Sequence, residues 1–70
     1  MMSSDFPARI RSERARLGLS QSEAAERAGM TREQYKHLEI RAGKDVRVST
    51  LARLVRAGYS LQAIAPELTK

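Results

Sequence analysis

Two helix-start signals lie eleven positions apart in this 70-residue chain, and they restrict its fold more than any other feature. Each is a capping box, in which Ser or Thr and a Glu or Gln three residues later satisfy each other's free backbone amides. The first box is residues 20–23 (Ser-Gln-Ser-Glu) and the second is residues 31–34 (Thr-Arg-Glu-Gln). Gly29 and Met30 lie between them, and glycine is typical of a helix end. The sequence therefore predicts two short helices joined by a tight turn.

Apolar spacing upstream of the first box predicts another helix. Pro7 suits a first helical turn, and the apolar residues Phe6, Ile10 and Leu17 follow a helical period. We therefore expect a helix over residues 7–17 and a flexible N-terminus over residues 1–6.

The second box is expected to open a helix over residues 32–40 that buries Tyr35 and Leu38. Ser49 is expected to cap a fourth helix, which Gly58 ends. The inner stripe of this fourth helix is expected to comprise Leu51, Leu54 and Val55.

The C-terminal segment has two interpretations. Alternation of Tyr59, Leu61 and Ala63 is typical of a strand, whereas Leu61 and Ile64 also have helical spacing. The expected fold is therefore all-α, with four to five helices and either a short strand or a further helix near the C-terminus.

The charge balance indicates the class of partner. Thirteen Lys and Arg against eight Asp and Glu give a net charge of +5. A basic excess favours polyanions, with nucleic acid first and an anionic membrane second. No apolar run approaches the roughly 20 residues that a membrane span needs, so we expect no membrane partner.

Several classes of site have no support in the sequence. There is no cysteine, and His37 is the only histidine, so neither a disulfide nor a metal site is expected. The chain also lacks a glycine-rich phosphate loop and a cysteine nucleophile. We expect no enzyme activity, no catalytic residue and no cofactor. The first residues lack the pattern of a signal peptide, which predicts a cytoplasmic protein.

A set of residues with matching spacing carries a resemblance to a known family. The chain resembles the Cro and lambda-repressor class of helix-turn-helix proteins, often called the XRE family, over residues 10–61. The residues that carry the likeness are Leu19-Ser20-Gln21, Ala25, Gly29, Met30-Thr31, Leu38-Glu39 and Ser49-Thr50-Leu51. The resemblance implies a lambda-repressor-like domain over residues 7–58 that places one helix in the major groove of DNA.

The later part of the chain is also similar to a narrower branch that includes HipB-like antitoxin repressors. In that branch a terminal strand pairs with its mate across a dimer, which favours a strand for the C-terminal segment. The resemblance implies a dimerisation element over residues 59–70, with an interface formed by Tyr59, Leu61, Ala63 and Ile64.

The outward face of the third helix holds the candidate base-reading residues. With Tyr35 inward, about 100° per residue turns four polar side chains outward, and the resemblance implies base contacts at the same positions. These residues are Arg32, Glu33, Lys36 and His37. Arginine matches the acceptors of guanine, and glutamate accepts from cytosine N4. The alternative is a solvated face, and His37 in particular fits a plain surface residue.

Candidate phosphate contacts come from helix starts and from the basic loop. Gln21 resembles the glutamine with which the family binds a phosphate, and Ser20 and Thr31 cap helix ends that favour an anion. Basic residues in the following loop are candidates for contacts to the DNA backbone, which add affinity without sequence information. They are Arg41, Lys44 and Arg47.

The family pattern also implies a structural ion pair between Arg14 and Glu39. The other arginines of the first helix are interpreted as solvated charges, and they are Arg9, Arg11 and Arg16. Tyr35 stands where the family usually has Val or Ile, and Ala24 stands where it has Leu. We expect the smaller residue to make room for the ring, with the third helix further from the second or the hydroxyl at a polar rim.

The sequence therefore predicts a transcriptional repressor or autoregulator that binds double-stranded DNA as a homodimer. Two copies of the third helix would enter successive major grooves of a palindromic operator, ~34 Å apart. The alternative is an antitoxin-type interaction module that neutralises a partner toxin and binds DNA as a complex.

Overall fold

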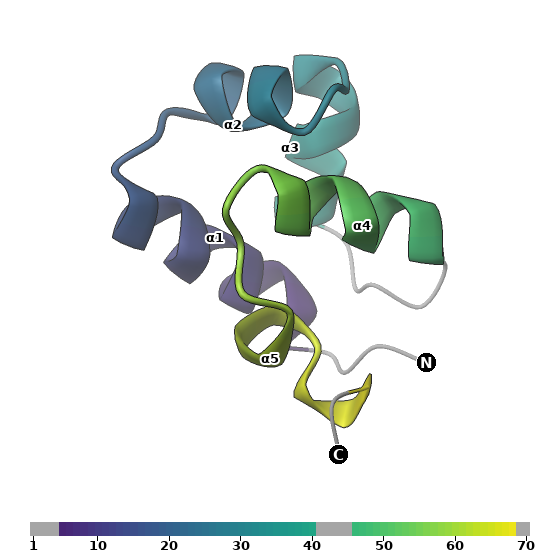
Figure 1. The fold of residues 1–70 in the computed structure, drawn as a ribbon. Helices are drawn as coiled ribbons and strands as arrows, with labels where there is room; N and C mark the ends of the chain where they lie inside the picture. Colours follow the sequence, from purple (N-terminus) through teal and green to yellow (C-terminus); the bar gives the residue numbers. More distant parts are fainter. Residues whose placement is uncertain (1–4, 41–45, 69–70) are drawn as a thin grey trace.

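All regular structure in the computed structural model, which describes residues 5–40 and 46–68, is helical. The expected all-α fold is confirmed, and the described residues contain no β-strand. Figure 1 shows α2 and α3 at one end of the molecule and α5 at the other. The elements are α1 (Phe6–Leu17), α2 (Gln21–Arg27), α3 (Arg32–Ile40), α4 (Val48–Arg56), α5 (Leu61–Ile64) and a 3-10 turn (Pro66–Leu68).

The first three helices begin and end close to where local sequence signals place them. Helix α1 starts one residue earlier than expected, and Phe6 is fully buried, so assigning residues 1–6 to a flexible N-terminus is wrong for Phe6. Gly18 ends α1 in the left-handed conformation, with φ of 70°, which glycine adopts without steric cost.

Both predicted capping boxes are present. The Glu23 amide donates to Ser20 Oγ at 3.1 Å, and the Ser20 amide donates to Glu23 Oε1 at 2.8 Å. The Gln34 amide donates to Thr31 Oγ1 at 3.1 Å, and the Thr31 amide donates to Gln34 Oε1 at 2.9 Å. These pairs satisfy amides that have no partner within the helix, which fixes the starts of α2 and α3.

Helix α4 differs from the prediction at its start and on one flank. It begins at Val48 after Arg47, whose side chain makes no capping hydrogen bond, so the expected Ser49 cap is wrong. The Arg47 carbonyl opens the helix instead, accepting from the amides of the first turn. Val55 is 43% exposed, and Ala57 is buried in its place. The buried side of α4 is therefore formed by Leu51 and Leu54, and the apolar Val55 is not part of it.

The C-terminal segment is helical, so the strand that the HipB-like resemblance favoured is wrong for this chain. Ser60 caps α5 by accepting from the Ala63 amide at 3.3 Å. Ile64 is fully buried, which helical spacing from the half-buried Leu61 allows. Pro66 opens the 3-10 turn, a position where its missing N–H has no helical partner to lose.

A single core joins the two ends of the fold. Its largest fully buried side chains come from α1, α3, α4 and α5, and they are Phe6, Ile10, Tyr35, Leu54 and Ile64. Helix α2 contributes only the small side chains of Ala24 and Ala25, which allows close approach to α3. No helix in the described ranges is both long and apolar enough to cross a bilayer.

Candidate nucleic-acid interface

The outer face of α3 is polar and open to solvent. Arg32, Glu33, Lys36 and His37 are all exposed, as the helical period predicts. No hydrogen bond or ion pair engages them from elsewhere in residues 5–40 and 46–68. Glu33 and His37 line a shallow hollow of about 350 Å³ together with Gln34. The structure therefore brings the four candidate base-reading residues onto one accessible surface.

The opposite face of α3 is held by a buried carboxylate. Glu39 is only 3% exposed and accepts from Arg14 Nε at 2.6 Å and Arg14 Nη2 at 3.3 Å. Gln21 Nε2 of α2 donates to the same carboxylate at 3.0 Å. Arg14 Nη1 also donates to the Leu19 carbonyl at 3.0 Å. Glu39 thus ties α3 to α1 and α2 at once.

Charge and hydrogen bonding keep this carboxylate ionised. Desolvation by burial acts to raise the pKa of Glu39, but hydrogen bonds from Arg14, Tyr35 and Gln21 outweigh it, so the pKa lies below its ordinary value. The Arg14 side chain is itself 25% exposed. The pair therefore lies at the edge of the core, with its carboxylate side dry and its guanidinium side partly hydrated.

The Tyr35 hydroxyl ends in this same polar cluster rather than at a polar rim. Tyr35 is fully buried, and its hydroxyl oxygen lies 2.5 Å from that of Tyr59. The Tyr35 hydroxyl also helps to lower the pKa of the Glu39 carboxyl. Ala24 is fully buried as well, consistent with the small residue that a bulky ring at position 35 requires.

A second buried carboxylate, Glu13, was missed by the sequence analysis. It is 6% exposed, and both its oxygens accept from Arg16 at 2.9 Å. It also accepts from the Ser60 amide at 2.8 Å, while Arg16 donates to the Gly58 carbonyl at 3.1 Å. The hydrogen bond from Arg16 and that from Ser60 lower the pKa of Glu13 against the effect of desolvation.

The arginines of α1 therefore have structural roles, and their interpretation as solvated charges is wrong for two of them. Arg16 fixes Glu13, and Arg11 donates to the Glu39 backbone carbonyl near the end of α3. The sequence did carry a signal for Glu13, because Ile10, Glu13 and Leu17 share the helical period of the buried face. An acidic residue at an inner position implies a partner.

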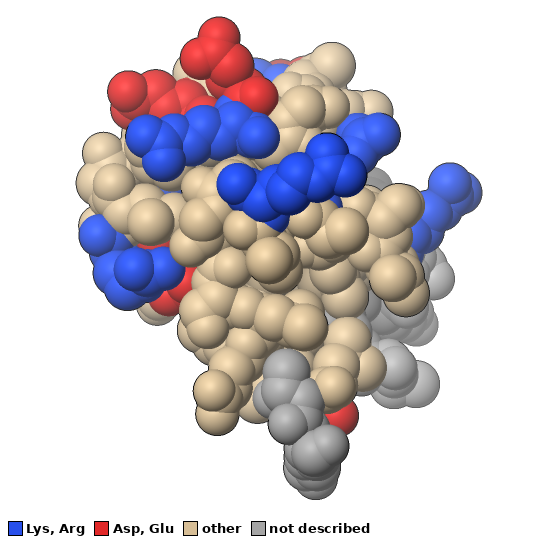
Figure 2. All heavy atoms as spheres, in the orientation of Figure 1, with Lys and Arg blue, Asp and Glu red and all other residues tan. Residues whose placement is uncertain are grey.

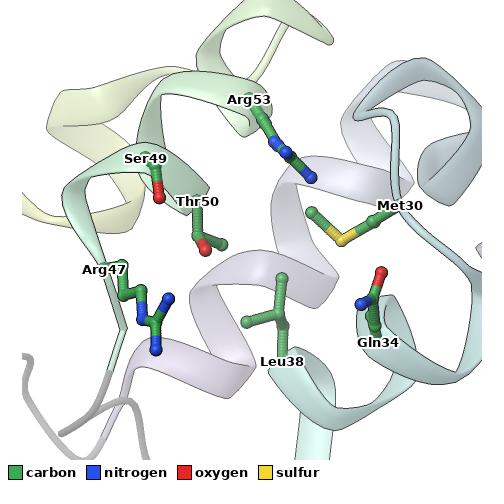
Figure 3. A pocket seen from close by; sticks show the side chains of 7 residues that line it. All are labelled: Met30, Gln34, Leu38, Arg47, Ser49, Thr50 and Arg53. Atoms are coloured by element: carbon green, nitrogen blue, oxygen red, sulfur yellow. The ribbon is translucent and has the colours of Figure 1, made fainter.

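The candidate phosphate contacts lie around the starts of the helices. Ser20 and Thr31 are exposed, and Gln21 is half-buried against Glu39. Arg47 lines a hollow of about 320 Å³ between α3 and α4 (Figure 3). Figure 3 shows Arg47 and Arg53 on the α4 side of it, with Met30 and Leu38 on the facing side. Arg41 and Lys44 lie outside the described residues.

Comparison with family profiles identifies the arrangement of α2, turn and α3. A family described as a helix-turn-helix domain matches residues 5–65, which is most of the chain. The chain belongs to the helix-turn-helix family. Comparison with curated proteins and with solved structures gave no match. The family is a DNA-binding module.

The candidate dimer residues of this helix-turn-helix domain divide into two groups. Tyr59 and Ile64 are 2% and 0% exposed and belong to the protomer's own core. Leu61 is half-buried and Ala63 is exposed, so these two reach the surface. The dimer interface itself stays a prediction.

Basic side chains of the helix-turn-helix domain gather over the end that holds the motif. Figure 2 shows basic side chains over α2, α4 and one end of α1, with acidic side chains beside those of α2, whereas the surface around α5 carries little charge in this view. Arg27, Arg53 and Arg56 line one hollow of about 260 Å³ beside the turn after α2. Among residues 5–40 and 46–68, no cluster of His, Cys, Asp or Glu has the arrangement that a metal ion needs.

Proposed function

We propose that this helix-turn-helix domain binds double-stranded DNA sequence-specifically and acts as a transcriptional repressor or autoregulator in the cytoplasm. The observation that carries the proposal is the contrast between the two faces of α3. Its outer face presents four exposed polar side chains, and its inner face is fixed by the buried Glu39. A rigidly held helix with a polar, accessible face is what reading base edges in the major groove requires.

The proposed base contacts follow from the chemistry of the four side chains. Arg32, in the first turn of α3, offers two parallel donors to the O6 and N7 atoms of guanine. Glu33 accepts from cytosine N4 when α3 is seated deeply enough to keep it from the phosphates. Lys36 donates to guanine or to a phosphate, and His37 completes the face one turn after Glu33.

The proposed phosphate contacts surround this face. Arg47, with Arg41 and Lys44 of the preceding loop, supplies positive charge on the α4 side. Ser20 and Thr31 supply contacts at the starts of α2 and α3.

Gln21 links the DNA backbone to the recognition helix in this proposal. Its amide nitrogen carries two hydrogens, and one of them is donated to Glu39 at 3.0 Å. The second hydrogen remains for a phosphate oxygen. A phosphate bound there would sit one side chain away from the carboxylate that holds α3.

We further propose a homodimer on a palindromic operator, with an interface that includes Leu61 and Ala63 beside the buried Tyr59 and Ile64. A domain of this size buries a modest share of its surface, so association adds stability. Sedimentation at tens of micromolar, with and without operator DNA, tests this proposal. Monomer under both conditions would rule the dimer out.

Selection from random duplex DNA, followed by salt titration of two variants, tests the proposed function. Arg32→Ala should lose preference at one symmetric base pair, at a cost of about 1–3 kcal/mol. Arg47→Ala is the matched control with the same loss of charge, and it should weaken operator and scrambled duplexes alike and reduce the salt slope by about 1.

Two outcomes contradict the proposal. If no sequence motif emerges from the selection, the isolated chain does not read DNA sequence. If Arg32→Ala weakens all duplexes uniformly, Arg32 contacts the DNA backbone rather than a base. Co-purification of a second protein that restores sequence preference would then support the antitoxin-type alternative.

A further inference from the structure

Tyr59 contacts the recognition helix from a distant part of the chain. It lies in the turn between α4 and α5 and is 2% exposed. Its hydroxyl lies 2.5 Å from the Tyr35 hydroxyl of α3. The two rings meet edge to face, with centroids 6.5 Å apart and planes at 73°. The contact is therefore a specific geometry rather than loose packing.

The contact between the two hydroxyls lies beside the buried carboxylate of α3. The Tyr35 and Tyr59 hydroxyls share one hydrogen bond, in which either oxygen can be the donor. The Tyr35 hydroxyl also helps to lower the pKa of Glu39. Arg14 and Gln21 donate to that same carboxylate.

These bonds attach α3 at two points on its inner face. Tyr35 and Glu39 are four residues apart, so they lie one above the other on the same side of the helix. Glu39, in the last turn, is attached to α1 and α2, and Tyr35, in the first half, is attached to the segment before α5. One attachment leaves a helix free to tilt about it, whereas two attachments along the axis oppose that tilt.

The segment that carries Tyr59 is itself fixed to α1. Glu13 accepts from the Ser60 amide at 2.8 Å, and Arg16 donates to the Gly58 carbonyl at 3.1 Å. Tyr59 lies between these two bonded residues, so its hydroxyl has a firm support. The second attachment of α3 therefore has a defined position relative to α1.

We propose that Tyr59 is a positioning residue for DNA recognition, whose hydroxyl bond to Tyr35 fixes the orientation in which α3 presents its base-reading face. The segment after α4 then influences base preference without touching DNA. This inference rests on the proposed function, because orientation affects preference only if α3 reads bases.

Tyr59→Phe is the variant that tests the proposal, since it removes one hydroxyl and keeps the ring. Ile10→Val is the matched control, because it weakens the same core from α1 and leaves both tyrosine hydroxyls in place. Binding to the selected operator and to a scrambled duplex is measured at fixed salt, with melting curves for each variant. Residual dipolar couplings of the α3 amides, compared with those of α1, report the orientation of α3 in the free protein.

Tyr59→Phe should lower the ratio of affinity for the operator to affinity for the scrambled duplex about tenfold. This is the size of effect expected from the loss of one hydrogen bond that orients α3. Affinity for the scrambled duplex should stay within about twofold. The residual dipolar couplings of the α3 amides should no longer fit the orientation that α3 has in the parent protein. Tyr35→Phe removes the bond to Tyr59 and also the hydroxyl beside Glu39, so it should act in the same direction and at least as strongly. The double variant should lose no more than Tyr35→Phe alone, because the bond to the Tyr59 hydroxyl is already absent in that variant.

Unchanged α3 couplings in Tyr59→Phe would overturn the inference, as would an equal fall in the affinity ratio in Ile10→Val. Equal binding of both duplexes by the parent protein would instead refute the proposed function. The couplings would then still decide, without DNA, whether Tyr59 orients α3.

Discussion

Replacing Glu39 by alanine removes the group on which the bonds of three helices converge. The carboxylate is 3% exposed, so its loss leaves Arg14 and Gln21 without their shared acceptor. Breaking a buried ion pair on one side costs about 3–5 kcal/mol. Because the Arg14 side chain is 25% exposed and can be partly hydrated, we take the lower end, about 3 kcal/mol.

This loss is large relative to the whole stability of the domain. A chain of this length has a free energy of unfolding of roughly 4–10 kcal/mol. For a domain of 60–100 residues, each 1 kcal/mol shifts Tm by about 4–8 °C. Glu39→Ala should therefore lower Tm by roughly 12–24 °C in a thermal melt followed by circular dichroism.

A double-mutant cycle separates the ion pair from general damage to the core. Arg14→Met combined with Glu39→Leu leaves no unpaired charge, so the double variant should be more stable than the sum of the two single losses predicts. The Leu19 carbonyl loses its donor in every variant that lacks Arg14, so full recovery is not expected. A Tm for Glu39→Ala within about 1 °C of the parent value, or strict additivity in the cycle, would refute the reasoning.

Three further predictions concern acid stability, capping and the turn before α5. The pKa values of Glu13 and Glu39 are lowered in the folded state from 4.5, so their stabilisation is complete at neutral pH and is lost as pH falls below about 4.5. Melting between about pH 3 and 7 should show this loss, and Glu39→Gln should flatten the curve. Ser20→Ala should cost about 1 kcal/mol in urea unfolding, and a cost equal to that of Ser22→Ala, an exposed non-capping control, would contradict it. Gly58, with φ of 110°, should not tolerate alanine: Gly58→Ala should lower Tm, whereas an unchanged Tm would show that the turn can relax.

The helix-turn-helix core could be predicted from the sequence because its signals are local. The two capping boxes act over three residues each, and the structure has all four of their hydrogen bonds. Gly18 and Gly29, both at positive φ, mark the two turns in the same way. Such features depend little on the rest of the chain, so a pattern within a few residues is enough to find them.

The C-terminal segment could not be predicted in the same way. Leu61, Ala63 and Ile64 satisfy both a period of two and a helical period over so short a stretch. The choice is made by tertiary contacts, because Ile64 enters the core and the Ser60 amide bonds to Glu13, which is 47 positions away. Tertiary contacts also decide that Val55 is exposed. An apolar side chain by itself does not show which side of α4 packs against the core.

The same difference between local signals and tertiary contacts applies to the candidate site. The outer face of α3 could be predicted from the sequence, and the way in which its inner face is held could not. The outward direction of Arg32 and Lys36 follows from helical period alone, once Tyr35 is known to be inward. What the period cannot give is the angle at which that face is held, because it depends on bonds between residues 24 and 25 positions apart, Tyr35 to Tyr59 and Arg14 to Glu39. A chain with the same α3 but phenylalanine at position 59 would present the same base-reading side chains and would lack one of the two bonds that aim them. Base preference in this domain is therefore expected to depend on residues that a comparison of recognition helices would leave out.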